Sequence, residues 1–149
     1  MWQRFAPSRI VLMHRARVLL ADDHPPLLAA LKRLLADEFE VVGEASDGAE
    51  AVRLARALQP DVVILDLAMP QMGGIEAMRH IRAESSGPAI LALTVLSDSA
   101  VRKAALEAGA RGYVLKSQAG SDLIPAIRAA LAGESLLPLR PGTGDRSDV

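Results

Sequence analysis

Short apolar segments of strand length alternate along the chain with longer segments whose apolar residues recur at helical spacing. The short segments are rich in leucine and β-branched residues and do not alternate with polar ones, which is typical of strands covered on both faces of a parallel sheet. The predicted strands are residues 17–21, 39–44, 61–65, 89–93 and 112–115.

Helix signals fill the intervals between these strands. The predicted helices are residues 25–35, 49–58, 75–83, 98–108 and 121–132. Pro60 ends the second of these helices, and Gly109 follows the fourth as a left-handed cap. Ser121 is a favourable N-cap for the fifth, which ends at Gly133.

A strand followed by a helix, repeated five times, predicts an α/β fold with a parallel sheet, helices on both faces and right-handed crossovers. We expect a doubly wound, flavodoxin-like (βα)5 domain with strand order 2-1-3-4-5 over residues 17–137. Residues 138–149 carry Pro, Gly, Asp, Arg and Ser and are expected to be a disordered tail or the start of a linker.

Residues 1–16 are expected to be a poorly ordered N-terminal extension. No acid precedes Asp22, while Arg4, Arg9 and Arg15 fall in this segment. A targeting peptide is one interpretation, but no cleavage pattern accompanies a clear apolar run. The second interpretation, which we favour, is a frayed terminus or a true start at Met13 instead of Met1.

Composition restricts the function classes. Half of the 149 residues are apolar, enough for one core, and there is no cysteine. A disulfide framework, a thiolate metal site and a cysteine nucleophile are therefore excluded, which fits a cytoplasmic location. The net charge of −1 indicates no general attraction to nucleic acid or membrane, and the longest uncharged run, residues 85–97, is too short to span a bilayer.

Polar residues fall at the carboxyl ends of four predicted strands. Asp22 and Asp23 follow the first strand, Asp66 the third, Thr94 the fourth and Lys116 the fifth. In an open parallel sheet these ends share one edge, where ligands bind at the point of strand-order reversal. We therefore expect the three acids to converge, with the threonine and the lysine beside them.

Three adjacent carboxylates repel one another unless a cation lies between them. Oxygen ligands without His or Cys favour a hard divalent ion, and a shallow site that retains water suits Mg²⁺. A carboxylate can also attack phosphorus and form an aspartyl phosphate. Lys116 would then neutralise phosphoryl charge, and the Thr94 hydroxyl would donate a hydrogen bond to it.

Each of these residues also has a plainer interpretation when it is taken alone. Asp22 or Asp23 could be a helix cap, Asp66 a loop acid, Thr94 a strand end and Lys116 a solvated surface charge. Their joint placement at one edge favours the functional interpretation. His24 could cap the first helix or face solvent and receives no catalytic role.

These segments together resemble the receiver domains of two-component response regulators, over roughly residues 17–137. The matching segments are residues 18–24 (VLLADDH), 61–70 (DVVILDLAMP), 72–74 (MGG), 93–94 (LT) and 109–116 (GARGYVLK). Within that family the chain is most similar to the NarL/FixJ type, whose members usually carry a LuxR-type helix-turn-helix output domain after the receiver. Gly133-Glu134-Ser135 also resembles the end of the last receiver helix in that subgroup.

The resemblance implies that a histidine kinase donates a phosphoryl group to Asp66. It also implies Mg²⁺ held by Asp22, Asp23, Asp66 and the main-chain carbonyl of Ala68, and a switch pair formed by Thr94 and Tyr113.

The implied output is a change on the face made by the fourth helix, the fifth strand and the fifth helix, with phosphorylation-dependent homodimerisation. The resemblance thus implies a phosphoprotein in signal transduction and transcription regulation, not an enzyme, which assists only its own phosphoryl transfer and loss. DNA would be bound only through an output domain that this chain lacks.

The sequence departs from the family pattern at three points. Ser117 replaces the proline that many relatives have after the lysine, so no cis-proline is expected, and Ala68 is small and apolar at a position that could influence dephosphorylation. The twelve residues after Leu137 are too few for a helix-turn-helix unit. The chain is then either a receiver cut from a longer regulator, which is slightly favoured, or a stand-alone receiver.

Two other function classes compete with the signalling receiver. A phosphohydrolase of the haloacid dehalogenase kind also forms an aspartyl phosphate, but it requires a second acid two residues after the nucleophile, where this chain has Ala68. A pseudo-receiver that binds partners without phosphorylation is the other alternative, and the complete set of acids, threonine and lysine disfavours it.

Overall fold

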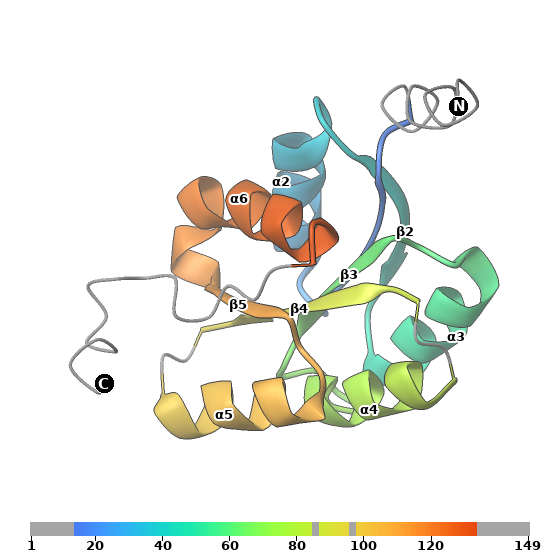
Figure 1. Ribbon diagram of the computed structural model, residues 1–149, viewed down its shortest axis with the longest axis vertical. Coiled ribbons are helices and arrows are strands. Elements are labelled where there is room, and N and C mark those ends of the chain that lie inside the picture. Colours follow the sequence, from blue (N-terminus) through green and yellow to red (C-terminus); the bar gives the residue numbers. More distant parts are fainter. Residues whose placement is uncertain (1–13, 85–86, 96–97, 134–149) are drawn as a thin grey trace, which may run out of the picture.

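A single parallel sheet of five strands forms the centre of the protein, with strand order β2-β1-β3-β4-β5 (Figure 1). The structure, a computed structural model, describes residues 14–84, 87–95 and 98–133. The elements are β1 (Arg17–Ala21), α2 (Pro25–Leu35), β2 (Glu40–Ala45), α3 (Gly48–Leu58), β3 (Val62–Asp66), α4 (Gly74–Glu84), β4 (Ala89–Thr94), α5 (Ser99–Ala108), β5 (Gly112–Leu115), the 3₁₀ turn η1 (Lys116–Gln118) and α6 (Ala119–Leu131). The predicted fold class and strand order are confirmed.

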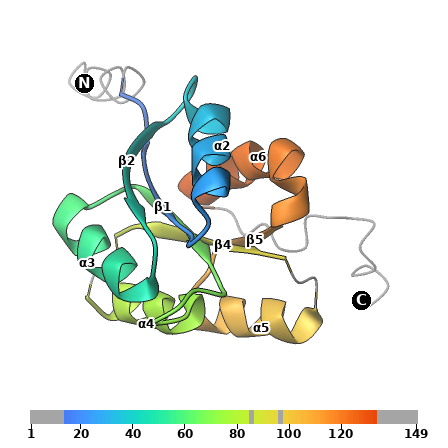
Figure 2. The same cartoon turned by 180° about the vertical axis from the view of Figure 1, so that it is seen from behind.

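Helices cover both faces of the sheet. Helices α2 and α6 lie on one face, and α3, α4 and α5 lie on the other (Figures 1 and 2). Alternate strand residues point to the two layers: Leu20 and Ile64 belong to the core under α2 and α6. Leu19 and Val63 belong to the core under α3, α4 and α5. This two-sided burial explains why the strands are apolar without alternation.

The register of the strands aligns their carboxyl ends in one row. Ala21 pairs with Leu65, so the residues that follow them, Asp22 and Asp66, are neighbours. Thr94 in turn pairs with Leu115, the residue before Lys116. The polar residues that the sequence places at strand ends therefore emerge at one edge of the sheet.

The predicted element boundaries are wrong at a few positions. Strands β2 and β3 each begin and end one residue later than predicted. Asp61 precedes β3, and its carboxylate accepts a hydrogen bond from the main-chain N–H of Arg17 at 2.7 Å.

Helix α6 begins at Ala119, before the predicted N-cap Ser121. The Ser121 hydroxyl instead donates to the carbonyl of Gln118 at 3.3 Å, inside the first helical turn. The turn η1 connects β5 directly to α6. The prediction of an N-cap at Ser121 did not indicate this turn.

The predicted left-handed cap at Gly109 is confirmed. Gly109 ends α5 with a φ of 118°, and its N–H donates to the carbonyl of Ala105. Among the described residues no peptide bond is cis, in keeping with Ser117 after the lysine. No helix among them is long and apolar enough to cross a membrane. Several predictions concern residues that the structure does not describe. They are the alternative starts at Met1 and Met13, most of the N-terminal extension (residues 1–13), the helix end at Glu134-Ser135 and the tail at residues 138–149.

Candidate functional site

Three carboxylates form a cluster at the carboxyl edge of the sheet. One oxygen each from Asp22, Asp23 and Asp66 lies within 4.8 Å of the other two. Asp22 and Asp66 are only 1% and 2% exposed, whereas Asp23 is exposed. The structure thus brings together the three acids that the sequence singled out, in a cluster that could bind a metal ion.

Main-chain donors fix the orientation of the two buried acids. The N–H of His24 donates to Oδ1 of Asp22 at 2.8 Å, and the N–H of Ala68 donates to Oδ1 of Asp66 at 3.1 Å. The Oδ2 atoms of both acids are buried and accept no well-directed hydrogen bond from the described residues. Each acid therefore keeps one oxygen for another cation or an incoming group.

Lys116 closes the cluster from the end of β5. Its Nζ forms ion pairs with Oδ2 of Asp22 at 2.8 Å and with Oδ2 of Asp66 at 3.2 Å. Burial lowers the pKa of Lys116, but its close contacts with the two carboxylates outweigh that effect, and the net pKa lies above its usual value. The lysine therefore stays charged at neutral pH.

The carboxyl group of Asp66 is harder to ionise than an ordinary aspartate. Burial raises its pKa most, and the neighbouring Asp22 charge raises it further. The N–H of Ala68 and the Lys116 ammonium lower the pKa without cancelling the rise. One ammonium therefore does not compensate three acids, and a divalent cation would relieve the remaining repulsion.

Oxygen ligands alone, two of them from buried carboxylates that share a single ammonium, fit a hard divalent ion better than a transition metal. The residues present thus fit the metal that the sequence led us to expect.

Thr94 and Tyr113 lie on the same face of the sheet. Tyr113 pairs with Ala92, two residues before Thr94, and side chains two residues apart on a strand share a face. Ala92 packs in the core under α3, α4 and α5, so both residues face the α5 layer. Thr94 is 3% exposed, whereas Tyr113 is partly exposed under the guanidinium of Arg102.

Gly74 allows the loop after β3 to pass close to the phosphoacceptor candidate. A Cβ atom on Gly74 would lie 2.2 Å from the main-chain oxygen of Asp66, a distance that no side chain can tolerate. The N–H of Gly74 donates to the carbonyl of Leu67 at 3.1 Å. The sequence indicated this glycine as part of the MGG segment at residues 72–74, with no sign of the close approach to Asp66.

His24 and Ala68 take simpler positions. His24 occupies the N-cap position of α2, but its side chain makes no cap hydrogen bond and is exposed, which agrees with the interpretation that it faces solvent. The side chain of Ala68 is exposed, and only its main-chain N–H contacts Asp66.

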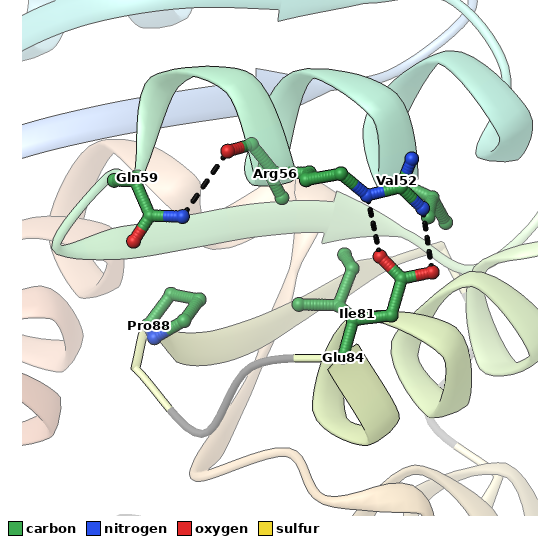
Figure 3. Close-up of a pocket in the computed structure, with 7 residues that line it drawn as sticks. Val52, Arg56, Gln59, Ile81, Glu84 and Pro88 are labelled. Carbon is green, nitrogen blue, oxygen red and sulfur yellow. Dashed lines mark hydrogen bonds and ion pairs between the residues drawn. The ribbon is translucent and has the colours of Figure 1, made fainter.

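A separate cavity of about 320 Å³ lies at the opposite edge of the sheet. It lies between the last turns of α3 and α4, beside Pro88 at the start of β4 (Figure 3). A two-contact ion pair between Arg56 and Glu84, at 2.8 and 2.6 Å, crosses it. Because it adjoins the amino end of β4, this cavity is not part of the acidic site.

Comparison with known proteins identifies the family of this chain. The response regulator receiver domain family matches residues 18–128. The transcriptional regulatory protein LiaR of Bacillus subtilis (strain 168) is 46% identical over 123 residues, covering 81% of this chain and 58% of LiaR. The nitrate/nitrite response regulator protein NarL of Escherichia coli (strain K12) is 41% identical over 124 residues, covering 82% of this chain and 57% of NarL. The chain thus spans about half the length of these relatives.

A solved structure has the same fold. The LuxR-family two-component response regulator from Aurantimonas sp. SI85-9A1 superposes with a TM-score of 0.78 at 46% identity, covering 81% of this chain and 88% of that one. The chain belongs to the response regulator receiver domain family, in its NarL/LuxR group. Receiver domains of this family are regulatory parts of two-component systems, in which response regulators receive phosphate from histidine kinases.

Proposed function

We propose that Asp66 is the phosphoacceptor of a signalling receiver and takes its phosphoryl group from a histidine kinase. The observation that supports this best is the position of the Asp66 carboxylate: Oδ1 accepts from the N–H of Ala68, and Oδ2 accepts no main-chain hydrogen bond from the described residues and lies 3.2 Å from the Lys116 ammonium. The main chain therefore orients the carboxylate and leaves one oxygen available as the nucleophile.

In the proposed transfer, Oδ2 of Asp66 forms a bond to phosphorus as the P–N bond of the kinase phosphohistidine breaks. The imidazole nitrogen leaves with the bonding electron pair. Lys116 neutralises charge on the phosphoryl oxygens, and the Thr94 hydroxyl donates a hydrogen bond to one of them. Thr94 is the last residue of β4, and Lys116 directly follows β5, the strand that pairs with it.

We propose Mg²⁺ as the metal, held by Asp22, Asp23, Asp66 and the main-chain carbonyl of Ala68. When bound, Mg²⁺ would offset the negative charge shared by the carboxylates and the incoming phosphoryl group. The support is the cluster of three carboxylates and the raised pKa of Asp66, which its burial and the Asp22 charge cause.

The proposed output runs through Thr94 and Tyr113. A phosphoryl group on Asp66 would draw the Thr94 hydroxyl toward it, and the space left would favour an inward Tyr113 ring, changing the α5-β5-α6 face. Such a change is a population shift driven by contacts present in one state only. We extend the proposal to phosphorylation-dependent homodimerisation through this face and to DNA regulation through a further output domain.

We propose residues 17–137 as the functional unit. This unit would assist only the transfer of the phosphoryl group to itself and its own dephosphorylation. The cytoplasmic location remains a prediction, as do the N-terminal extension and the tail.

A phosphotransfer assay tests this function. We expect acetyl phosphate or phosphoramidate with Mg²⁺ to add one phosphoryl group to the wild type and none to Asp66→Asn, as measured by intact mass. A variant of an exposed acid distant from the site, Asp37→Asn, should behave like the wild type. Phosphorylation of Asp66→Asn at the wild-type rate would refute the assignment.

A further inference from the structure

The proposed switch residue Tyr113 contacts a cation that has no role in the chemistry described so far. The guanidinium carbon of Arg102 lies over the Tyr113 ring, 5.8 Å from its centroid. This distance is within the ~6 Å over which the face of an aromatic ring attracts a cation. Because Arg102 belongs to α5 and Tyr113 to β5, the contact joins the helix to the strand of the proposed output face.

Few apolar contacts anchor α5 to the sheet. The buried residues of α5 are Ala105 and Ala108, both small and both in its second half. By contrast, α2 buries three leucines, and α6 buries Leu123 and Ile127. Since burial stabilises in proportion to apolar area, the amino-terminal half of α5, which has no fully buried residue, gains less from burial than α2 or α6, and a contact such as that of Arg102 matters more there.

Two charged residues at the start of α5, Asp98 and Arg102, lie near Tyr113. Asp98 caps the helix by accepting from the N–H of Ala100 at 2.7 Å, and its carbonyl accepts from the N–H of Arg102 at 3.1 Å. Burial raises the pKa of the Tyr113 hydroxyl, Arg102 lowers it and Asp98 raises it, as expected for a ring that lies near both charges. Movement of the ring away from this surface would separate it from Arg102.

We infer that Arg102 is a positioning residue that stabilises the resting, partly exposed position of Tyr113 and so restrains the switch. This inference rests on the proposed function, because it requires Tyr113 to respond to a phosphoryl group at Asp66. Loss of Arg102 should shift the equilibrium toward the signalling state. A contact of this strength corresponds to about a two- to five-fold shift.

The experiment uses the single tyrosine of the sequence as its probe. Protein labelled with 3-fluorotyrosine should give one ¹⁹F resonance, from Tyr113, which is followed during titration with beryllofluoride and Mg²⁺ as a phosphoryl mimic. The proteins compared are the wild type, Arg102→Ala, Arg102→Lys and Lys103→Ala. Lys103 is the neighbouring exposed cation on α5 and serves as a charge-matched control.

We expect the resonance of Arg102→Ala to lie closer to its beryllofluoride-bound position before any ligand is added. Its beryllofluoride affinity should be about two- to five-fold higher, with Arg102→Lys nearer to the wild type and Lys103→Ala unchanged. Equal affinities in the wild type and Arg102→Ala, or an equal gain in Lys103→Ala, would overturn the role of Arg102 while leaving the switch intact. A resonance that does not respond to beryllofluoride in any protein would overturn the switch and the role of Arg102 together.

Discussion

Nζ of Lys116 lies 3.2 Å from Oδ2 of Asp66, and the two side chains are 19% and 2% exposed. The same ammonium lies 2.8 Å from Oδ2 of Asp22. A lysine from the end of β5 thus supplies positive charge to two acids from β1 and β3, at the oxygens that main-chain N–H groups leave free. We propose that, during phosphorylation, the same charge faces the phosphoryl oxygens.

Replacement of Lys116 by methionine should destabilise the metal-free protein, because two buried carboxylates would lose their cation. We expect a loss of about 1–3 kcal/mol, less than for a fully buried pair because the lysine keeps some contact with solvent. Urea unfolding with a chelator measures this loss, and Mg²⁺ should restore part of it. Phosphorylation should slow by about 10²-fold. The exposed Lys103→Met variant is the control, and an equal loss of stability in both variants would contradict the role of Lys116.

Asp23 provides a direct test of metal binding, because it is the exposed member of the cluster. Mg²⁺ should raise the free energy of unfolding of the wild type by about 2.7 kcal/mol at 100 times its Kd. Asp23→Asn should weaken that increase with little effect on the metal-free protein, whereas the exposed and distant Asp37→Asn should not. Thermal unfolding across a Mg²⁺ titration is the measurement. The same midpoint shift in Asp23→Asn as in the wild type would exclude Asp23 as a ligand.

The neighbouring glycines 73 and 74 offer a matched pair for the loop beside Asp66. A Cβ atom at Gly74 would lie 2.2 Å from the Asp66 carbonyl, whereas at Gly73 its nearest contact would be an ordinary 3.7 Å. Gly74→Ala should therefore cost about 1–3 kcal/mol and slow phosphorylation, because the backbone of Asp66 must move. Gly73→Ala should change both quantities little. Similar stabilities and phosphorylation rates for the two variants would show that this close approach is unimportant.

The fold and the membership of the site could be predicted because both follow from local patterns. Buried strands and polar strand ends are visible in sequence, and parallel register brings Asp22, Asp66 and Lys116 together with no further information. The start of α6 could not be predicted, because Ser121 is a good N-cap and the 3₁₀ turn at residues 116–118 depends on its tertiary setting.

Side-chain contacts between different helices and strands could not be predicted from the sequence either. Nothing in the helical pattern of α5 distinguishes Arg102, which lies over Tyr113, from the exposed Lys103 beside it. The close approach at Gly74 likewise requires the path of the loop after β3.

The ion pair between Glu38 and Arg128 predicts a specific dependence of stability on pH. The Arg128 guanidinium donates to both carboxylate oxygens of Glu38, at 2.8 and 2.5 Å, and this hydrogen bonding lowers the pKa of Glu38. A carboxyl group with a lowered folded-state pKa stabilises the protein above its unfolded pKa, and that stability is lost as the pH falls through the folded value. Urea unfolding as a function of pH should thus show a smaller acid-side loss in Glu38→Gln than in the wild type. The same acid-side slope in both proteins would contradict the contribution of this pair.

Chemical trapping of the phosphorylated residue tests the proposed acceptor most directly. The wild type would be phosphorylated with phosphoramidate and Mg²⁺, reduced with borohydride, which converts an aspartyl phosphate to homoserine, and mapped by peptide mass spectrometry. We expect homoserine at position 66 alone, and none in a sample prepared with a chelator. Homoserine at position 22 or 23 with Asp66 unmodified, or a phosphoryl group retained on His24, would contradict the assignment of Asp66.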